Sequence, residues 1–219
     1  MSPSAAESLE ALQREAAACR RCALWQNATQ TVFGEGPPDA DLLFVGEQPG
    51  DQEDRQGRPF VGPAGIIFDK ALDEAGIDRA RTYVTNAVKH FKNEPRGKRR
   101  IHMKPNVSEI KICRWWLEQE IALLHPKLTI ALGATAAYSL FGKTIGIRAT
   151  RGTILQSELA GPAFVTVHPS SLLRQPDASS RRREYRDFVA DLQRLRQIWQ
   201  ARSSHSVAAA PFSAGRVRS

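Results

Sequence analysis

Three polar side chains that could do chemistry follow short apolar runs of the chain: Glu47, Asn86 and His168. Each run is typical of a buried strand, and open α/β sheets place their sites at the carboxyl ends of such strands. Alone, Asn86 would more often be a cap or turn residue, and His168 an incidental histidine at a helix start. Because all three stand at strand ends, we expect one crevice to hold them.

The segment after the first of these runs is the most informative part of the chain. From Leu42 to Gly65 it reads LLFVGEQPGDQEDRQGRPFVGPAG. Its glycines could serve only tight turns, or cradle a phosphate at a helix start. Turns alone do not require acids, an amide and an aromatic ring in the same loop. The segment therefore predicts a loop that holds a ligand.

The side chains of Asn86 and His168 suit a pyrimidine. An asparagine amide offers a donor and an acceptor side by side, which fits the O4 and N3–H edge of uracil and mismatches cytosine. His168 opens the sequence HPSSLLR and could give a proton or a hydrogen bond to a departing pyrimidine oxygen. Ser170 and Ser171 could bind phosphate through their hydroxyls and a helix start.

Positive charge points to a polyanionic partner. The chain has a formal net charge of +8, which could also serve solubility if it were spread evenly. It is instead concentrated in one stretch that contains the single acid Glu94. The basic residues of that stretch are Lys89, Lys92, Arg96, Lys98, Arg99, Arg100 and Lys104. This concentration predicts a loop that binds nucleic acid.

The cysteines suggest a metal site. Cys19 and Cys22 form a C-x-x-C pair, and Cys113 lies in the helical pattern ICRWWLEQEI. Three unrelated buried cysteines would explain a C-x-x-C pair poorly, and three cysteines do not form a disulfide framework. Three soft ligands require a fourth, and spacing alone leaves zinc and an iron–sulfur cluster equally open.

Alternating strand and helix patterns predict the α/β class: a single domain with a four-stranded, mainly parallel sheet flanked by helices. The expected strands are Leu42–Val45, Thr82–Thr85, Leu128–Leu132 and Phe164–Val167. Helical patterns cover Ala5–Cys19, Pro63–Ala75, Ser108–Leu124, Ala134–Phe141 and Arg181–Trp199. We expect the domain, with its N-terminal metal-binding segment, to cover residues 1–200 and a disordered tail to cover 201–219.

Neither a membrane span nor a secretory leader is expected. No apolar run is long enough to cross a bilayer, and the N-terminal segment lacks a basic region followed by an apolar stretch. We therefore expect a soluble, cytoplasmic protein that does not bind membranes, and we expect it to be a monomer.

Five short motifs, in this order and spacing, resemble the iron–sulfur branch of the uracil-DNA glycosylase superfamily over roughly residues 10–199. They are GEQPG, PFVGPAG, TNAVKH, LGATAA and HPSSLLR. Within that branch, GEQPG and the inserted basic loop GKRRIHMKP resemble the UdgX group, whose members excise uracil and remain covalently joined to the DNA. The resemblance implies uracil-containing DNA as the partner, with single strands preferred.

The resemblance also implies roles for individual residues. Phe60 would stack on the flipped base, Asn86 would read its edge and Gln48 would support the pocket. His168 would bond the uracil oxygen and His102 would be the nucleophile.

The full substrate-binding set that we expect is Gly46, Gln48, Asp51, Phe60 and Asn86, with Glu47 as a further catalytic residue. The DNA-binding set is Lys98, Arg99, Arg100, Ser170 and Arg174. The cofactor implied is a [4Fe-4S] cluster, with zinc as the alternative, and His90 stands where related glycosylases have a cysteine ligand.

A separate chemical argument supports His102. Breaking an N-glycosidic bond leaves a cationic sugar carbon and a uracil anion, and water usually meets the cation. A neutral imidazole could replace water, since Arg99 and Arg100 disfavour its protonated form and Glu47 could hold the ring and accept its proton. An N-alkylated histidine is a poor leaving group, so the intermediate would become the product. Alternatively, His102 is only a phosphate contact in a DNA-binding loop.

Two other functions remain open at this point. The protein could be a conventional glycosylase that turns over and leaves an abasic site, with His102 only positioning DNA. It could also be a non-catalytic module that binds uracil-containing or abasic DNA through its basic loop.

Overall fold

The computed structural model describes residues 4–207, with side chains described up to residue 202. Its centre is a five-stranded sheet in the order β2-β1-β5-β7-β6. The strands are β1 (Leu42–Gly46), β2 (Thr82–Asn86), β5 (Leu128–Leu132), β6 (Thr153–Ser157) and β7 (Gly161–Thr166). All neighbours pair in parallel except β6 and β7, which are antiparallel. The mainly parallel α/β sheet is confirmed, with β6 as an additional edge strand.

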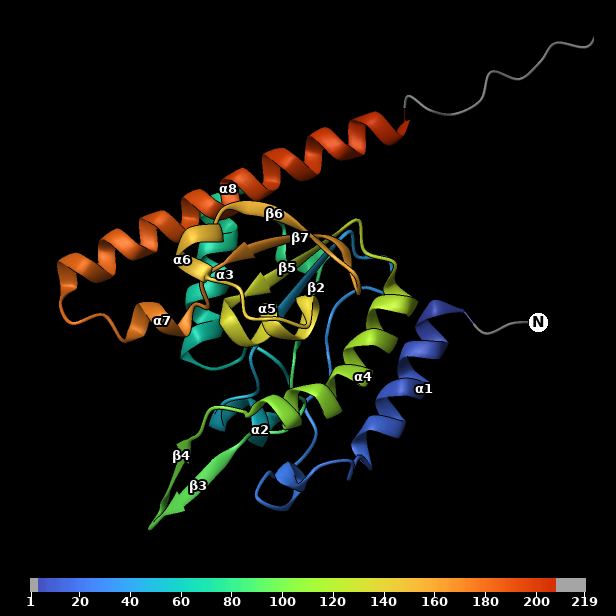
Figure 1. The fold of residues 1–219 in the computed structure, drawn as a ribbon, viewed down its shortest axis with the longest axis vertical. Coiled ribbons are helices and arrows are strands. Elements are labelled where there is room, and N and C mark those ends of the chain that lie inside the picture. Colours follow the sequence, from blue (N-terminus) through green and yellow to red (C-terminus); the bar gives the residue numbers. More distant parts are fainter. Residues whose placement is uncertain (1–3, 208–219) are drawn as a thin grey trace, which may run out of the picture.

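Helices cover both faces of the sheet because the buried strands alternate their side chains between two cores (Figure 1). Leu42 and Phe44 point toward α3 (Pro63–Ala75) and α8 (Ala178–Val207). Their neighbours Leu43 and Val45 point toward α4 (Val107–Leu124) and α5 (Gly133–Phe141). The first helix, α1 (Ala5–Ala17), packs against the outer side of α4.

Short elements complete the chain between these helices and strands. They are η1 (Ala23–Gln26), α2 (Asp51–Gln56), η2 (Arg79–Arg81), α6 (Ile147–Thr150) and α7 (Ser170–Leu173). The basic stretch forms an antiparallel hairpin of β3 (Asn93–Arg96) and β4 (Arg99–His102). Figure 1 shows this hairpin projecting from the body beside α2, on the side away from α8.

The last helix is longer than the sequence predicts. It continues to Val207, so residues 201–207, expected in a disordered tail, are helical. Residues 208–219, the rest of that expected tail, lie outside the described residues. No helix in the described part of the chain is both long and apolar enough to span a bilayer.

Candidate active site

One cavity of about 1360 Å³ lies at the carboxyl ends of the parallel strands. Its wall includes the three predicted strand-end residues Glu47, Asn86 and His168, together with Phe60 and His102. Gly46 and Asn86 are direct partners in the β1–β2 register, which brings two strand ends together. The predicted crevice is therefore present, and the hairpin contributes His102 to it from outside the sheet.

Phe60 and Asn86 meet above Gly46. A Cβ atom added to Gly46 would lie 2.4 Å from Asn86 Oδ1 and 2.8 Å from Phe60 Cζ, so only glycine allows both side chains this close. Phe60 has a φ of 57°, a left-handed conformation that is strained for an aromatic residue. Its ring centroid lies 5.1 Å from that of Phe68 and 6.0 Å from that of His168. Packing thus holds Phe60 rigidly at the cavity wall.

His168 is held as a neutral hydrogen-bond donor. The backbone N–H of Ser170 donates to His168 Nδ1 at 3.1 Å, so the ring proton is on Nε2. The Ser170 hydroxyl lies 2.9 Å from the same nitrogen and accepts a bond from Arg174 at 3.1 Å. Burial, followed by the nearby positive charge of Arg174, lowers the pKa of His168 to about 4. At neutral pH this residue can donate a hydrogen bond but is not a proton source.

Gln48 fixes the tautomer of His102. The backbone N–H of Lys92 donates to Gln48 Oε1 at 3.1 Å, and Gln48 Nε2 donates to the Met103 carbonyl at 3.0 Å. These bonds set which end of the amide carries the hydrogens. Gln48 Nε2 also lies 2.8 Å from His102 Nε2. The imidazole nitrogen must therefore accept, which leaves its lone pair on Nε2 and its proton on Nδ1.

Glu47 lies between this imidazole and the sheet. Its Oε1 is 3.6 Å from His102 Nε2, while its Oε2 accepts a hydrogen bond of 2.5 Å from Thr135 Oγ1. The carboxylate faces the nitrogen that has the lone pair. It is thus placed to stabilise a positive charge that develops at that point of the cavity.

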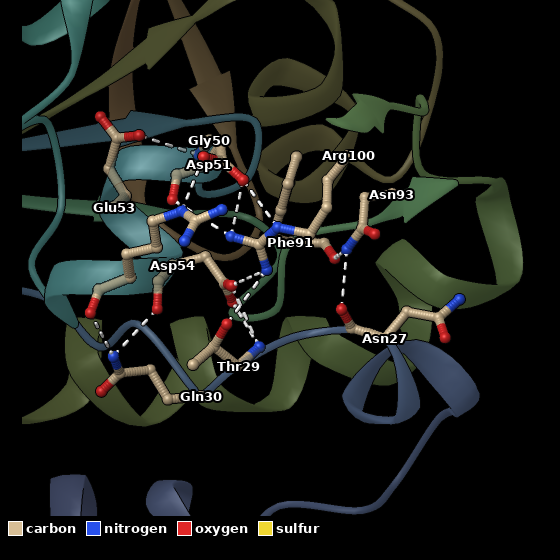
Figure 2. A network of polar contacts seen from close by, with 11 residues as sticks. Asn27, Thr29, Gln30, Gly50, Asp51, Glu53, Asp54, Phe91, Asn93 and Arg100 are labelled. Atoms are coloured by element: carbon tan, nitrogen blue, oxygen red, sulfur yellow. Dashed lines mark hydrogen bonds and ion pairs between the residues drawn. The ribbon is translucent and has the colours of Figure 1, made fainter. Parts of the chain in front are cut away.

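Arg100 holds the hairpin against α2 (Figure 2). Its guanidinium donates to Asp51 Oδ1 at 2.6 Å and to Asp54 Oδ2 at 2.5 Å. Asp54 is fully buried and also accepts from the backbone N–H of Thr29. The hydrogen bond from Arg55 lowers the pKa of Asp51. Burial opposes this shift and Arg100 adds to it, so the net effect is a lowered pKa. Arg100, predicted to bind DNA, and Asp51, predicted to bind substrate, therefore pair with each other.

The remaining predicted DNA contacts divide into two groups. Lys98 and Arg99 are exposed at the turn of the hairpin. Ser170 and Arg174 belong to the segment after β7 and line the cavity together with His102. Arg148 of α6, which the sequence did not suggest, also lines the cavity, and it has no ion-pair partner within residues 4–202.

The three cysteines pack into one cluster beside α1 and α4. Trp116 Nε1 donates to Cys19 Sγ at 3.2 Å, and the Lys89 backbone N–H donates to Cys113 Sγ at 3.1 Å. His90 is buried, and its Nε2 lies 3.0 Å from Thr31 Oγ1. In this arrangement of the described residues, no three His, Cys, Asp or Glu side chains form the ligand set of a single metal ion. N–H groups directed at sulfur are typical of cysteines that act as thiolate ligands.

The fold and its cavity define an α/β protein with a site at the carboxyl ends of its parallel strands. A model of the uracil DNA glycosylase superfamily matches residues 33–193, and the chain belongs to that superfamily. A type-4 uracil-DNA glycosylase of Sulfurisphaera tokodaii is 35% identical over 179 residues, covering 78% of each chain. A second, of Thermotoga maritima, is 37% identical over 177 residues, covering 80% of this chain and 88% of that one. A third, of Pyrobaculum aerophilum, is 36% identical and covers 72% and 81%.

Proposed function

We propose that this protein removes uracil from DNA and is then joined to the sugar through His102. The observation that carries the proposal is the hydrogen bond between Gln48 and His102. It leaves a neutral imidazole with its lone pair on Nε2, in the same cavity as Asn86 and His168. Membership of the superfamily and the printed names of the type-4 relatives support uracil excision. The covalent step is inferred from the position and the tautomer of the His102 imidazole.

Recognition and departure of the base would use the buried wall of the cavity. A flipped uracil would stack on Phe60 and present its O4 and N3–H edge to the Asn86 amide. As the glycosidic bond breaks, negative charge develops on the uracil oxygens. The Nε2–H of neutral His168 would donate to one of them, as a donor in an oxyanion hole does.

Capture would follow at the sugar carbon C1′. The bond from C1′ to uracil N1 breaks, and its electron pair leaves with uracil, which takes a proton from water. The lone pair of His102 Nε2 leaves its hydrogen bond with Gln48 Nε2 and forms the new bond to C1′. The ring is then an N-alkyl imidazolium facing Glu47, and it becomes neutral by losing its Nδ1 proton to solvent. The N-alkylated histidine is a poor leaving group, so the covalent product persists.

We propose that the DNA strand crosses the cavity mouth between two basic walls. One wall is the hairpin, which contributes Lys104 next to His102, and the other contains Arg148 and Arg174. Phosphates on either side of the flipped nucleotide would contact these cations. A single strand fits best because its bases have no partner to leave before flipping.

We propose a [4Fe-4S] cluster held by Cys19, Cys22, Cys113 and His90. The soft sulfur donors and the N–H groups directed at them fit such a cluster. Its role would be structural, since these residues join the segment after α1 to α4 and to the continuation of β2. Anaerobically purified protein should contain iron and sulfide in about equal amounts. His90→Ala should lose iron, whereas one tightly bound zinc per chain would contradict the proposal.

The second candidate function is a conventional glycosylase that releases an abasic strand. Glu47 supports it, because a carboxylate at this position could activate water instead of stabilising His102. Denaturing electrophoresis of the protein with a labelled, uracil-containing single strand separates these functions. A heat-stable adduct supports capture, an abasic product without adduct supports turnover, and neither product supports a binding module.

His102→Ala should lose the adduct and keep uracil release, because Phe60, Asn86 and His168 act before capture. His125→Asn is a matched control, since it removes the histidine that caps the end of α4. It should leave the adduct yield unchanged. An adduct that survives in His102→Ala would mean that another residue is the nucleophile.

A further inference from the structure

Among the described residues, the Thr135 side chain forms a hydrogen bond with one member of the proposed catalytic machinery, Glu47. It lies in the first turn of α5, is 3% exposed and donates its hydroxyl hydrogen to Glu47 Oε2 at 2.5 Å. Its neighbours Gly133 and Ala134 line the cavity, but Thr135 itself does not. A side chain in this position cannot touch DNA directly. Any effect that it has on the reaction must therefore pass through the Glu47 carboxylate.

The hydrogen bond restricts how Glu47 can turn. The end of a glutamate side chain rotates broadly, so an unbound carboxylate would sample many orientations. Thr135 is β-branched and has few χ1 rotamers in a helix, so its hydroxyl is itself well fixed. With Oε2 bound to Thr135, Oε1 faces His102 Nε2 at 3.6 Å. The positive end of the α5 dipole also favours a carboxylate here.

We propose that Thr135 is a positioning residue that holds Glu47 toward His102 and thereby favours capture by the imidazole over attack by water. This inference rests on the proposed function. A fixed carboxylate stabilises the ring that becomes cationic when Nε2 bonds to C1′. A carboxylate free to rotate can instead bind a water molecule and take its proton as a general base. That water would then add its oxygen to C1′, leaving an abasic sugar and free protein.

The direct test is the partition between adduct and free abasic strand in a single turnover, compared for the parent, Thr135→Val and Thr135→Ser. Valine removes the hydroxyl at nearly constant volume, and serine keeps it. A partition ratio does not depend on the fraction of active protein, so a loss of stability alone would not change it. We expect the adduct-to-abasic ratio to fall about tenfold in Thr135→Val, as loss of one bond to a charged group allows. Thr135→Ser should stay within about threefold of the parent.

A double-mutant cycle tests whether Thr135 acts through Glu47. In a Glu47→Ala background, Thr135→Val should have no further effect on the ratio, because the side chain that Thr135 orients is gone. An undiminished effect in that background would overturn the inference. So would a Thr135→Val ratio equal to that of the parent.

The outcome also separates this inference from the proposed function. If the parent forms no adduct, capture by His102 is wrong, and the role of Thr135 is then read from the rate of uracil release. A rate loss that depends on Glu47 would still support positioning, and an unchanged rate would overturn it.

Discussion

The two sides of the cavity are built differently. On the sheet side, Phe60, Asn86 and His168 are held by strand register, close packing at Gly46 and burial. On the hairpin side, the His102 side chain is 50% exposed and depends on polar bonds from Gln48 and on the ion pairs of Arg100. The sheet side has the properties expected of base recognition, and the hairpin adds a nucleophile to it. Substitutions on the two sides should therefore have different signatures.

The largest expected effect comes from breaking the anchor of the hairpin. Arg100→Gln leaves the fully buried Asp54 without its cation, and removing one partner of a buried ion pair costs about 3 kcal/mol. Chemical denaturation should show this loss, and adduct formation should fall with it. Arg99→Gln is the matched control, because Arg99 is exposed at the hairpin turn and its loss should change stability by less than about 0.5 kcal/mol. Equal stability of the two variants would show that the ion pairs do not hold the hairpin.

The next effect tests the sheet side. Asn86→Ala removes a paired donor and acceptor, and each unmatched polar edge of the base costs about 1–3 kcal/mol. Single-turnover uracil release should slow by about a hundredfold or more, and the adduct should disappear with it. In His102→Ala, by contrast, only the adduct should be lost. If Asn86→Ala released uracil at the parent rate, the two sides would not divide recognition from capture.

A smaller effect is expected on the pH dependence of the unfolding free energy, and the pKa of His168 sets its direction. The folded pKa of His168, about 4, is below the ordinary value of 6.5, so the unfolded chain takes up a proton first as pH falls. Stability contributed by this residue is therefore full above pH 6.5 and is lost as pH falls toward 4. Replacing His168 with Gln should flatten the unfolding free energy across that window. Uracil release should show no loss that depends on His168 between pH 8 and pH 5, since neutral His168 is the donor. An inflection near pH 6.5 that His168→Gln abolishes would contradict this assignment.

The smallest expected effect concerns the basic wall that contains Arg148 and Arg174. Arg148→Ala should weaken binding of a single strand and reduce the slope of log affinity against log salt by about 1, as loss of one phosphate contact does. Fluorescence anisotropy at several salt concentrations measures that slope. An unchanged slope would place the DNA path elsewhere, and the hairpin alone would then supply the phosphate contacts.

Sequence reasoning predicted the strands that carry the site, because buried parallel strands are continuous apolar runs. It missed β6, an edge strand whose residues are mostly half-buried and whose pattern is correspondingly weak. The basic stretch was recognised as an insertion, but its hairpin form depends on pairing that composition does not reveal. The end of α8 was placed too early because a solvated helix has little apolar periodicity.

In the site, too, the sequence predicts positions next to strands better than contacts between residues far apart in the chain. Glu47, Asn86 and His168 stand next to recognisable strands, so topology alone brings them together. The partners of Arg100 could not be predicted, because Asp51 and Asp54 are 49 and 46 residues away and only the folded chain selects them. Thr135 lies in the LGATAA motif, yet nothing in that motif indicates that its hydroxyl reaches Glu47.

Mass spectrometry of the trapped protein identifies the residue that is bonded to the sugar carbon, and we expect that residue to be His102. After reaction with a uracil-containing single strand, nuclease digestion should leave a deoxyribose remnant on the protein. Trypsin should then release a modified peptide from Ile101 to Lys111, since cleavage before Pro105 is blocked. We predict that fragmentation places the added mass on His102. A remnant on any other residue, or an unmodified peptide from protein that migrates as an adduct, would show that His102 is not the nucleophile.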